Sequence, residues 1–217
     1  MKIKQLIIWV CILVLFLLLM LAALDDIGEV VANSYQRYFY FLGGCLLMFL
    51  VDRYTSKNNR VLKTLHHEST HMFFNLVTFR KVLMIQVDMN GGVVSSVGNK
   101  WMLEAVSLSP YSFPLAAYIV MAFGYFFAND MTHIYAVILG VTYAFHLLCI
   151  KEDFGPWPVL GRHQPDINQY PLLFSYLYIF CFWLFNTFIV LLSVRRDIIA
   201  AYSYVFNCFI ETIMDIL

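Results

Sequence analysis

The stretch LKTLHHESTHMFFNLVTF, residues 62–79, places a cluster of ionisable side chains inside an apolar run. On a helix, residues four apart lie on one face, so His67 and His71 can each offer a ring nitrogen to one metal ion. Glu68 is rotated by about 100° from His67, close to such an ion but poorly placed as a ligand. That is the position of a general base acting on metal-bound water, so the stretch predicts a metal-dependent hydrolytic site.

The apolar setting of these residues supports a functional role. Ionisable side chains are costly in a membrane helix and usually serve a function there. The alternative is that the stretch begins a cytoplasmic helix whose histidines face lipid headgroups. His66 has no assigned role in the predicted metal site.

The composition of the chain is that of a polytopic membrane protein. Of its 217 residues, 61% are hydrophobic and only 13% are charged, against about a quarter charged in soluble domains. The formal net charge is zero, so no basic surface suggests nucleic acid as a partner. The five cysteines lie singly in apolar sequence, and we interpret them as small membrane-embedded hydrophobes. We expect one integral, multi-pass membrane domain, residues 1–217, in contact with the lipid bilayer.

Two membrane helices are expected before the histidines. Residues 5–24 are uncharged and long enough to cross the hydrocarbon core. Residues 38–51 reach spanning length by including weakly polar residues before them, so 1–59 forms a predicted N-terminal helical hairpin. The densest cluster of positive charge follows the second helix, from Arg53 to Lys63. By the positive-inside rule, this loop and the N-terminus are cytoplasmic.

Three longer apolar runs follow, at residues 105–129, 131–150 and 167–194. The first contains Pro110 and Pro114, which predict a bent membrane helix. The tail, residues 196–217, has apolar residues at helical spacing and predicts an amphipathic or membrane helix. In total we expect about six transmembrane or re-entrant helices.

The amino-acid composition changes after the histidines and predicts a small β-hairpin near residues 82–97. The segment VLMIQVDMNGGVVSSVG, residues 82–98, is rich in β-branched side chains, and Asn90-Gly91 favours a type I′ turn. Because an open sheet edge cannot face lipid, the hairpin must lie outside the hydrocarbon or be covered by protein. The predicted fold class is an all-α polytopic membrane protein with this hairpin inserted.

A catalytic zinc site needs a third protein ligand and an open position for water. Asp166 is our first choice, because it stands at the start of the apolar run 167–194 and can project into the helix bundle. The alternative for Asp166 is a helix N-cap. Asp153 is the second choice and His146 the third. The full set of downstream candidates is His133, His146, Glu152, Asp153, His163 and Asp166.

The predicted topology contains a conflict. His67 and Asp166 both lie near the N-terminal ends of their predicted helices, so these helices must run parallel for the ligands to meet. Two full spans between them would make them antiparallel. We therefore expect the histidine-containing helix to re-enter or to stop part way. The alternatives are that one of the two intervening runs does not cross, or that the zinc lies deep enough for both ligands to reach it.

These segments resemble the intramembrane zinc metalloproteases of the site-2 protease class, the M50-like peptidases. HESTH, residues 67–71, is similar to the metal-binding helix of the family, VDMNGG (87–92) to the hairpin after it, and HQPDI (163–167) to the segment with its aspartate ligand. The resemblance covers residues 60–195, the metalloprotease-like core, although Ile167 replaces the glycine that usually follows the aspartate.

The resemblance implies Zn²⁺ bound by His67, His71 and Asp166, with Glu68 as base and acid. The expected function is a zinc-dependent intramembrane endopeptidase acting on membrane-embedded or membrane-proximal segments of a membrane protein or peptide. The alternatives are a catalytically inactive membrane binding or chaperone protein of the same fold, and an ion transporter. A transporter predicts polar residues on several helices, whereas here they concentrate at 66–71 and 146–166, which favours a single site.

Overall fold

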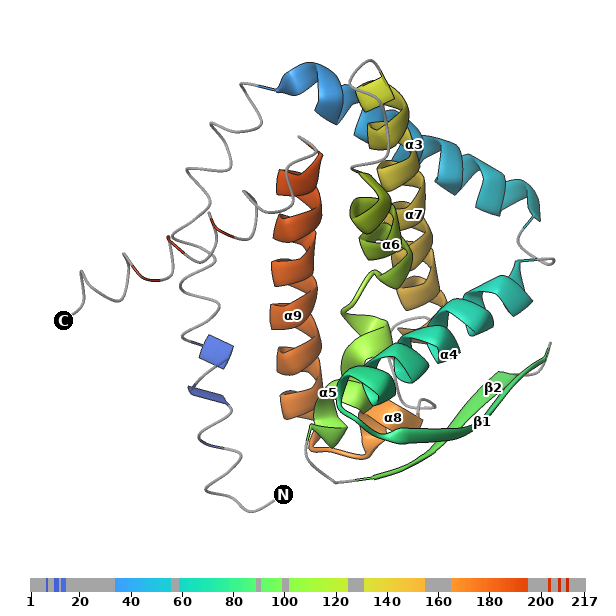
Figure 1. The fold of residues 1–217 in the computed structure, drawn as a ribbon, viewed down its shortest axis with the longest axis vertical. Coiled ribbons are helices and arrows are strands. Elements are labelled where there is room, and N and C mark those ends of the chain that lie inside the picture. The colour runs from blue at the N-terminus through green and yellow to red at the C-terminus, as the bar shows by residue number, and fades with distance from the viewer. Residues whose placement is uncertain are drawn as a thin grey trace.

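The computed structural model covers the whole chain and describes two-thirds of it. The described residues are 34–55, 59–88, 91–98, 102–124, 131–154 and 165–194, with residues 7, 10, 11, 13, 14, 203, 207 and 210. This part is mostly helical with one two-stranded hairpin, as predicted (Figure 1). The predicted first helix and the predicted C-terminal helix lie largely outside the described residues.

The described helices and strands follow each other in the order expected around the hairpin. They are α3 Tyr35–Thr55, α4 Arg60–Val77, β1 Lys81–Asp88, β2 Gly91–Val97, α5 Leu103–Leu108, the 3₁₀ turn η1 Ser109–Tyr111, α6 Leu115–Phe123, α7 Thr132–Phe154, α8 Pro165–Asn168 and α9 Leu172–Ser193.

Two of these helices, α7 and α9, are long and apolar enough to cross a membrane. The α5–η1 segment and α6 meet that standard together, but they are bent by 86°, as in a broken span or a re-entrant loop. Pro110 lies in η1 and Pro114 precedes α6, so the bend predicted from these prolines is confirmed. Two or three candidate spans are thus present in the described residues, and the expected count of about six is not confirmed.

The crossing of α3 and α7 depends on close backbone approach. A Cβ atom added to Gly44 would overlap the carbonyl of Val137, and one added to Gly140 would overlap the carbonyl of Phe41. Small residues at such crossings let helix backbones touch. The Tyr38 hydroxyl donates a 2.8 Å hydrogen bond to the Leu191 carbonyl, which joins α3 to α9. These contacts set the position of α7, whose C-terminal end contacts α4 through Glu152 and Asp153.

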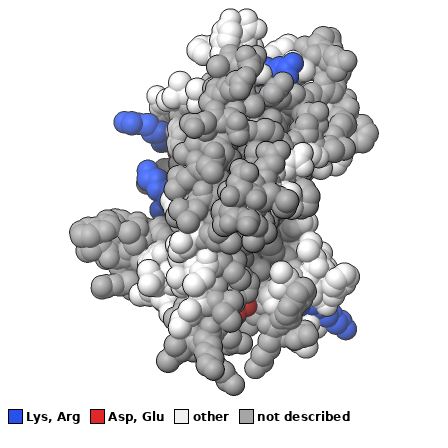
Figure 2. Space-filling model, turned by 90° about the vertical axis from the view of Figure 1, so that its left-hand side faces the viewer, with Lys and Arg blue, Asp and Glu red and all other residues white. Residues whose placement is uncertain are grey.

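Helix α4 buries its polar face. Its buried side chains are all polar or charged, namely Lys63, His66, Glu68, Thr70, His71 and Asn75. Its apolar side chains Leu62, Leu76 and Val77 are more than half exposed. This reverses the pattern of a helix in water and suits one whose outer face meets an apolar environment. Figure 2 draws the opposite side of the molecule, away from α4, where a few Lys and Arg side chains lie at the margins.

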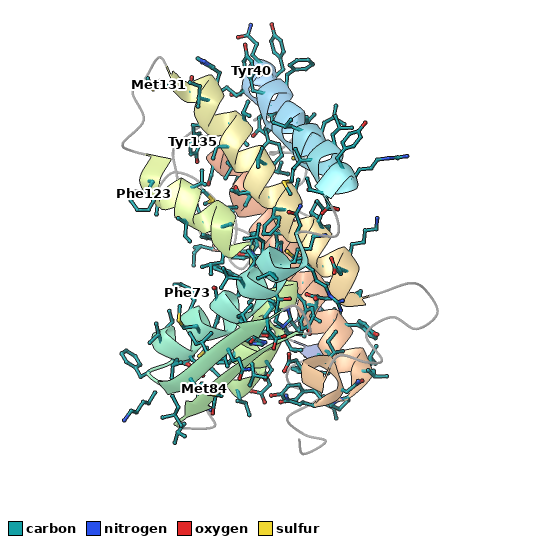
Figure 3. The ribbon with its side chains drawn as sticks, turned by 90° about the vertical axis from the view of Figure 1, so that its right-hand side faces the viewer. Tyr40, Phe73, Met84, Phe123, Met131 and Tyr135 are labelled. Atoms are coloured by element: carbon teal, nitrogen blue, oxygen red, sulfur yellow. The ribbon has the colours of Figure 1, made fainter. Side chains whose placement is uncertain are left out.

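The hairpin packs on α4 at the lower end of the bundle (Figure 1). In Figure 3, Phe73 of α4 and Met84 of β1 lie at this end, whereas Tyr40 of α3 and Met131, just before α7, lie at the other. The strands are antiparallel, with Asp88 opposite Gly91. Residues 89 and 90 lie outside the described residues, so the type I′ turn predicted from Asn90-Gly91 is not described. Gly91 opens β2.

Candidate metal centre

Three potential metal ligands from two separate segments meet beside the middle turns of α4. The Nε2 atom of His71 lies 3.3 Å from Oδ2 of Asp166, and Nε2 of His67 lies 3.7 Å from the same oxygen. All three donor atoms lie within 4.8 Å of one another. A tetrahedral ion with bonds of about 2.0–2.1 Å holds its ligand atoms about 3.4 Å apart. The arrangement therefore fits a small divalent cation, and within the described residues it is the one such group of His, Cys, Asp and Glu.

Each histidine is oriented by a hydrogen bond from its other ring nitrogen. His71 Nδ1 lies 2.8 Å from the carbonyl oxygen of Val106, which can only accept, so this nitrogen carries the proton. His67 Nδ1 lies 2.9 Å from Oδ2 of Asp153. Both contacts leave Nε2 as the ring nitrogen that faces Asp166. Outer acceptors of this kind fix the tautomer and direction of metal-binding imidazoles in known metal sites.

Of the three candidates for the third ligand, the structure places Asp166 within the cluster and Asp153 and His146 outside it. Asp153 contacts the ring nitrogen of His67 that faces away from the cluster, so it lies outside the group of three donor atoms. His146 is fully buried beside His66 and is not part of the cluster. Asp166 does not cap the long helix α9, which begins after Pro171.

The other downstream candidates are engaged elsewhere or lie outside the described residues. His133 packs against the ring of Tyr40 at the opposite end of the bundle (Figure 3). Glu152 forms a 2.9 Å ion pair with Lys63, which also lies 2.8 Å from Asp52. His163 falls outside the described residues.

The predicted conflict in topology assumed that His67 and Asp166 both lie near the N-terminal ends of long helices. The structure places both residues differently. Helix α4 begins at Arg60, so His67 and His71 lie in its middle turns and not at its start. Asp166 lies on the separate short helix α8, before α9. The ligands can therefore meet without parallel long helices, and the 86° bend between η1 and α6 supplies a segment that need not cross.

Glu68 shares a cavity with the cluster. The cavity has a volume of about 300 Å³, and its lining includes His67, Glu68, Asp153, Asp166 and Gly92. Glu68 is 6% exposed. A Cβ atom added to Gly92 would overlap Glu68 Cγ and lie 2.7 Å from Oε1, so the backbone of β2 lies directly against this carboxyl group. Burial raises the pKa of Glu68, an effect that the nearby imidazoles of His67 and His71 oppose only in part.

The electrostatics of the cluster favour a cation. Helices α4 and α8 lie outside the candidate spans. Burial alone raises the pKa of Asp166, but hydrogen bonds from His67 and His71 outweigh it and hold the pKa well below its usual range. Burial alone lowers the pKa of His67, whereas the carboxylates of Asp153 and Asp166 raise it to about 10. Positive charge is therefore stabilised at the point where the three donors converge.

The sequence could not identify some of the residues that build this site. The acceptor of His71 is a backbone carbonyl, that of Val106, which no side-chain pattern marks. The ring of Tyr111, in the turn between α5 and α6, stands edge to face with His67 at 5.3 Å between centroids. In the sequence, the feature that marks the position of Tyr111 is the pair of prolines that interrupts the apolar run, because η1 at this interruption packs against α4.

Comparison of the chain with models of protein families, with curated proteins and with solved structures finds no match.

Proposed function

We propose that the protein is a zinc-dependent endopeptidase that cuts membrane-embedded or membrane-proximal peptide segments. The observation that carries the proposal is the convergence of His67 Nε2, His71 Nε2 and Asp166 Oδ2, with both Nδ1 atoms held by other acceptors. Two imidazoles and one carboxylate form a donor set typical of catalytic zinc, which keeps a fourth position open. Zinc, when bound, supplies Lewis acidity that activates water and polarises a peptide carbonyl.

Glu68 is the general base and acid of this proposal. It lies in the same cavity as the ligands but is not one of them. It accepts a proton from the attacking water and returns it to the leaving amine. A carboxylate whose pKa is raised by burial is a stronger base than an exposed one, so it accepts the proton of the water more readily.

The hairpin supports binding of an extended substrate. Gly91 and Gly92 bring the start of β2 into the cavity, with no side chain between its backbone and Glu68. A substrate segment that has left its helical conformation can pair with a strand edge of the hairpin, the mode called β-augmentation. A hairpin that only covers the site is the alternative.

A second, apolar cavity favours a membrane-embedded substrate. It has a volume of about 380 Å³ and lies between α7 and α9, with Leu147, Ile150, Phe154, Trp183 and Tyr111 in its lining. Tyr111 also contacts the ring of His67. An apolar surface thus extends from the candidate spans to the edge of the metal centre, where apolar side chains of a substrate can be held.

The deciding experiment combines Glu68→Gln with measurements of zinc content and of cleavage of a membrane-anchored reporter. We expect cleavage to fall by at least about 100-fold while zinc content stays at the level of the unmodified protein. Glu104→Gln, which changes a carboxyl group outside the cavity lining, is the matched control and should cleave normally. Unchanged cleavage in Glu68→Gln would refute the mechanism. A protein that binds zinc but cleaves nothing in any form would support the binding or chaperone alternative.

A further inference from the structure

His66 and His146 form a buried pair that the metal centre does not use. His66 on α4 is 7% exposed and His146 on α7 is 0% exposed, and their ring centroids lie 5.5 Å apart. None of their four ring nitrogens has a hydrogen-bond partner among the described residues. A neutral imidazole carries one donor and one acceptor, and leaving both unpaired in the interior costs free energy. Two such rings side by side therefore require an explanation.

The geometry of the pair is close to that of a direct hydrogen bond. An N–H···N bond of about 2.9 Å, with the ring radii added, separates two imidazole centroids by about 5 Å. The observed 5.5 Å lies close to this separation, and the planes are tilted by 47°. Rotation about the last side-chain torsion of histidine is soft, so small rotations of the two rings are enough to form the bond.

The position of α4 depends on polar contacts of this kind. Every buried side chain of α4 is polar or charged. Its side-chain contacts with α7 include the ion pair of Lys63 with Glu152 and the 2.9 Å contact of His67 with Asp153. His66 lies between Lys63 and His67 on α4, and it faces the same partner helix. The aromatic contacts of Phe73 and Phe74 with Phe113 lie nearer the C-terminal end of α4, so polar contacts help to fix its rotation against α7.

We propose that His66 and His146 form an N–H···N hydrogen bond that sets the rotation of α4 against α7 and so directs Nε2 of His67 to the metal. Both are positioning residues. The inference rests on the metal-binding part of the proposed function and does not depend on peptidase activity. Because His66 and His67 are neighbours, a rotation of α4 that breaks the pair also moves His67 away from Asp153.

A double-mutant cycle tests the pair in the full-length protein, with His66→Phe, His146→Phe and the double variant. The readouts are the zinc dissociation constant and the visible absorption spectrum of the Co²⁺-loaded protein, which reports ligand geometry. We expect each single variant to bind zinc about 10-fold more weakly or worse. The double variant should bind no more weakly than the worse single one, because removing both partners leaves no orphan group. His146→Gln, which keeps a donor and an acceptor, should restore binding to within about threefold.

His133→Phe is the control, since this histidine of α7 packs on Tyr40 at the other end of the bundle. Single-variant effects that multiply in the double variant would overturn the proposal. So would two zinc ions per chain in the unmodified protein and one in either single variant, because the pair would then be a cation site.

Nuclear magnetic resonance on ¹⁵N-histidine-labelled protein adds a test that needs no variant. A scalar coupling between one ring nitrogen of His66 and one of His146 supports the bond, and its absence contradicts it. The outcomes also distinguish failure of the proposed metal centre from failure of the proposed histidine pair. Failure of the unmodified protein to bind zinc refutes the metal centre, whereas zinc binding with independent histidines refutes only the pair.

Discussion

The Nδ1 atom of His67 lies 2.9 Å from Oδ2 of Asp153, and this contact ties the middle of α4 to the last turn of α7. It separates two aspartates that look alike in the sequence. Asp153 approaches the ring from outside the cluster, while Asp166 approaches Nε2 from within it. The two residues should therefore respond differently to mutation.

Asp166→Ala should abolish stoichiometric zinc binding. The variant removes the carboxylate that, among the described residues, faces both Nε2 atoms, and two imidazoles alone do not complete a zinc site. Zinc content of the purified protein, measured by elemental analysis, is the readout. Full occupancy in Asp166→Ala would move the third ligand to another residue.

Asp153→Asn should weaken zinc binding without abolishing it. The amide oxygen can still accept from Nδ1 of His67, but the charge that makes the imidazole a better ligand is gone. We expect a loss of about 10- to 100-fold in affinity, measured by competition with a chelating dye. If Asp153→Asn loses zinc entirely while Asp166→Ala retains it, the roles assigned to the two aspartates are reversed.

Zinc binding should depend on pH through His67. After removal of zinc with a chelator, the folded protein keeps a proton on this ring, whose pKa is about 10 against an ordinary 6.5. Its contribution to the free energy of unfolding is then fully present below about pH 6.5 and is lost as the pH rises toward about 10. Zinc must displace the proton, so zinc affinity rises over the same window, with release of about one proton per ion. Calorimetry in buffers of different ionisation enthalpy measures that proton, and an affinity independent of pH in this window would contradict the prediction.

Asp166 adds the opposite dependence at low pH. Its pKa lies below the ordinary value of 3.8, because His67 and His71 donate to it. Its contribution to stability is therefore present above about pH 4 and is lost as the pH falls. The chelated protein should unfold at its highest temperature between these two windows.

Gly92→Ala should impair catalysis with zinc retained. The added methyl group overlaps Glu68, so either the carboxyl group or the start of β2 must move. Displacement of a reacting group by about 1 Å can cost about 100-fold in rate, and reporter cleavage should fall by about 10- to 100-fold. Gly43→Ala is the control, since an added Cβ there meets nothing within 4 Å. Normal cleavage by Gly92→Ala would show that the hairpin does not position Glu68.

Local features of the site follow from the sequence. His67, Glu68 and His71 lie on one short stretch, so the helical period by itself puts both imidazoles on one face with the carboxyl group beside them. Pro110 and Pro114 predicted the bend because a proline removes a backbone donor wherever it stands. The hairpin followed from the β-branched side chains and glycines of residues 82–98.

Long-range relations were decided only by the tertiary structure. Asp153 and Asp166 lie 86 and 95 residues from their histidine partners, and no local period can say which ring nitrogen each one meets. The number of spans depends on the bend at η1 and on α4, whose polar face is turned inward. The sequence thus predicted a list of candidate metal ligands. Which of them come together was decided by the packing of α4 on α7 and α8. Contacts between distant segments depend on chain topology and not on local propensity.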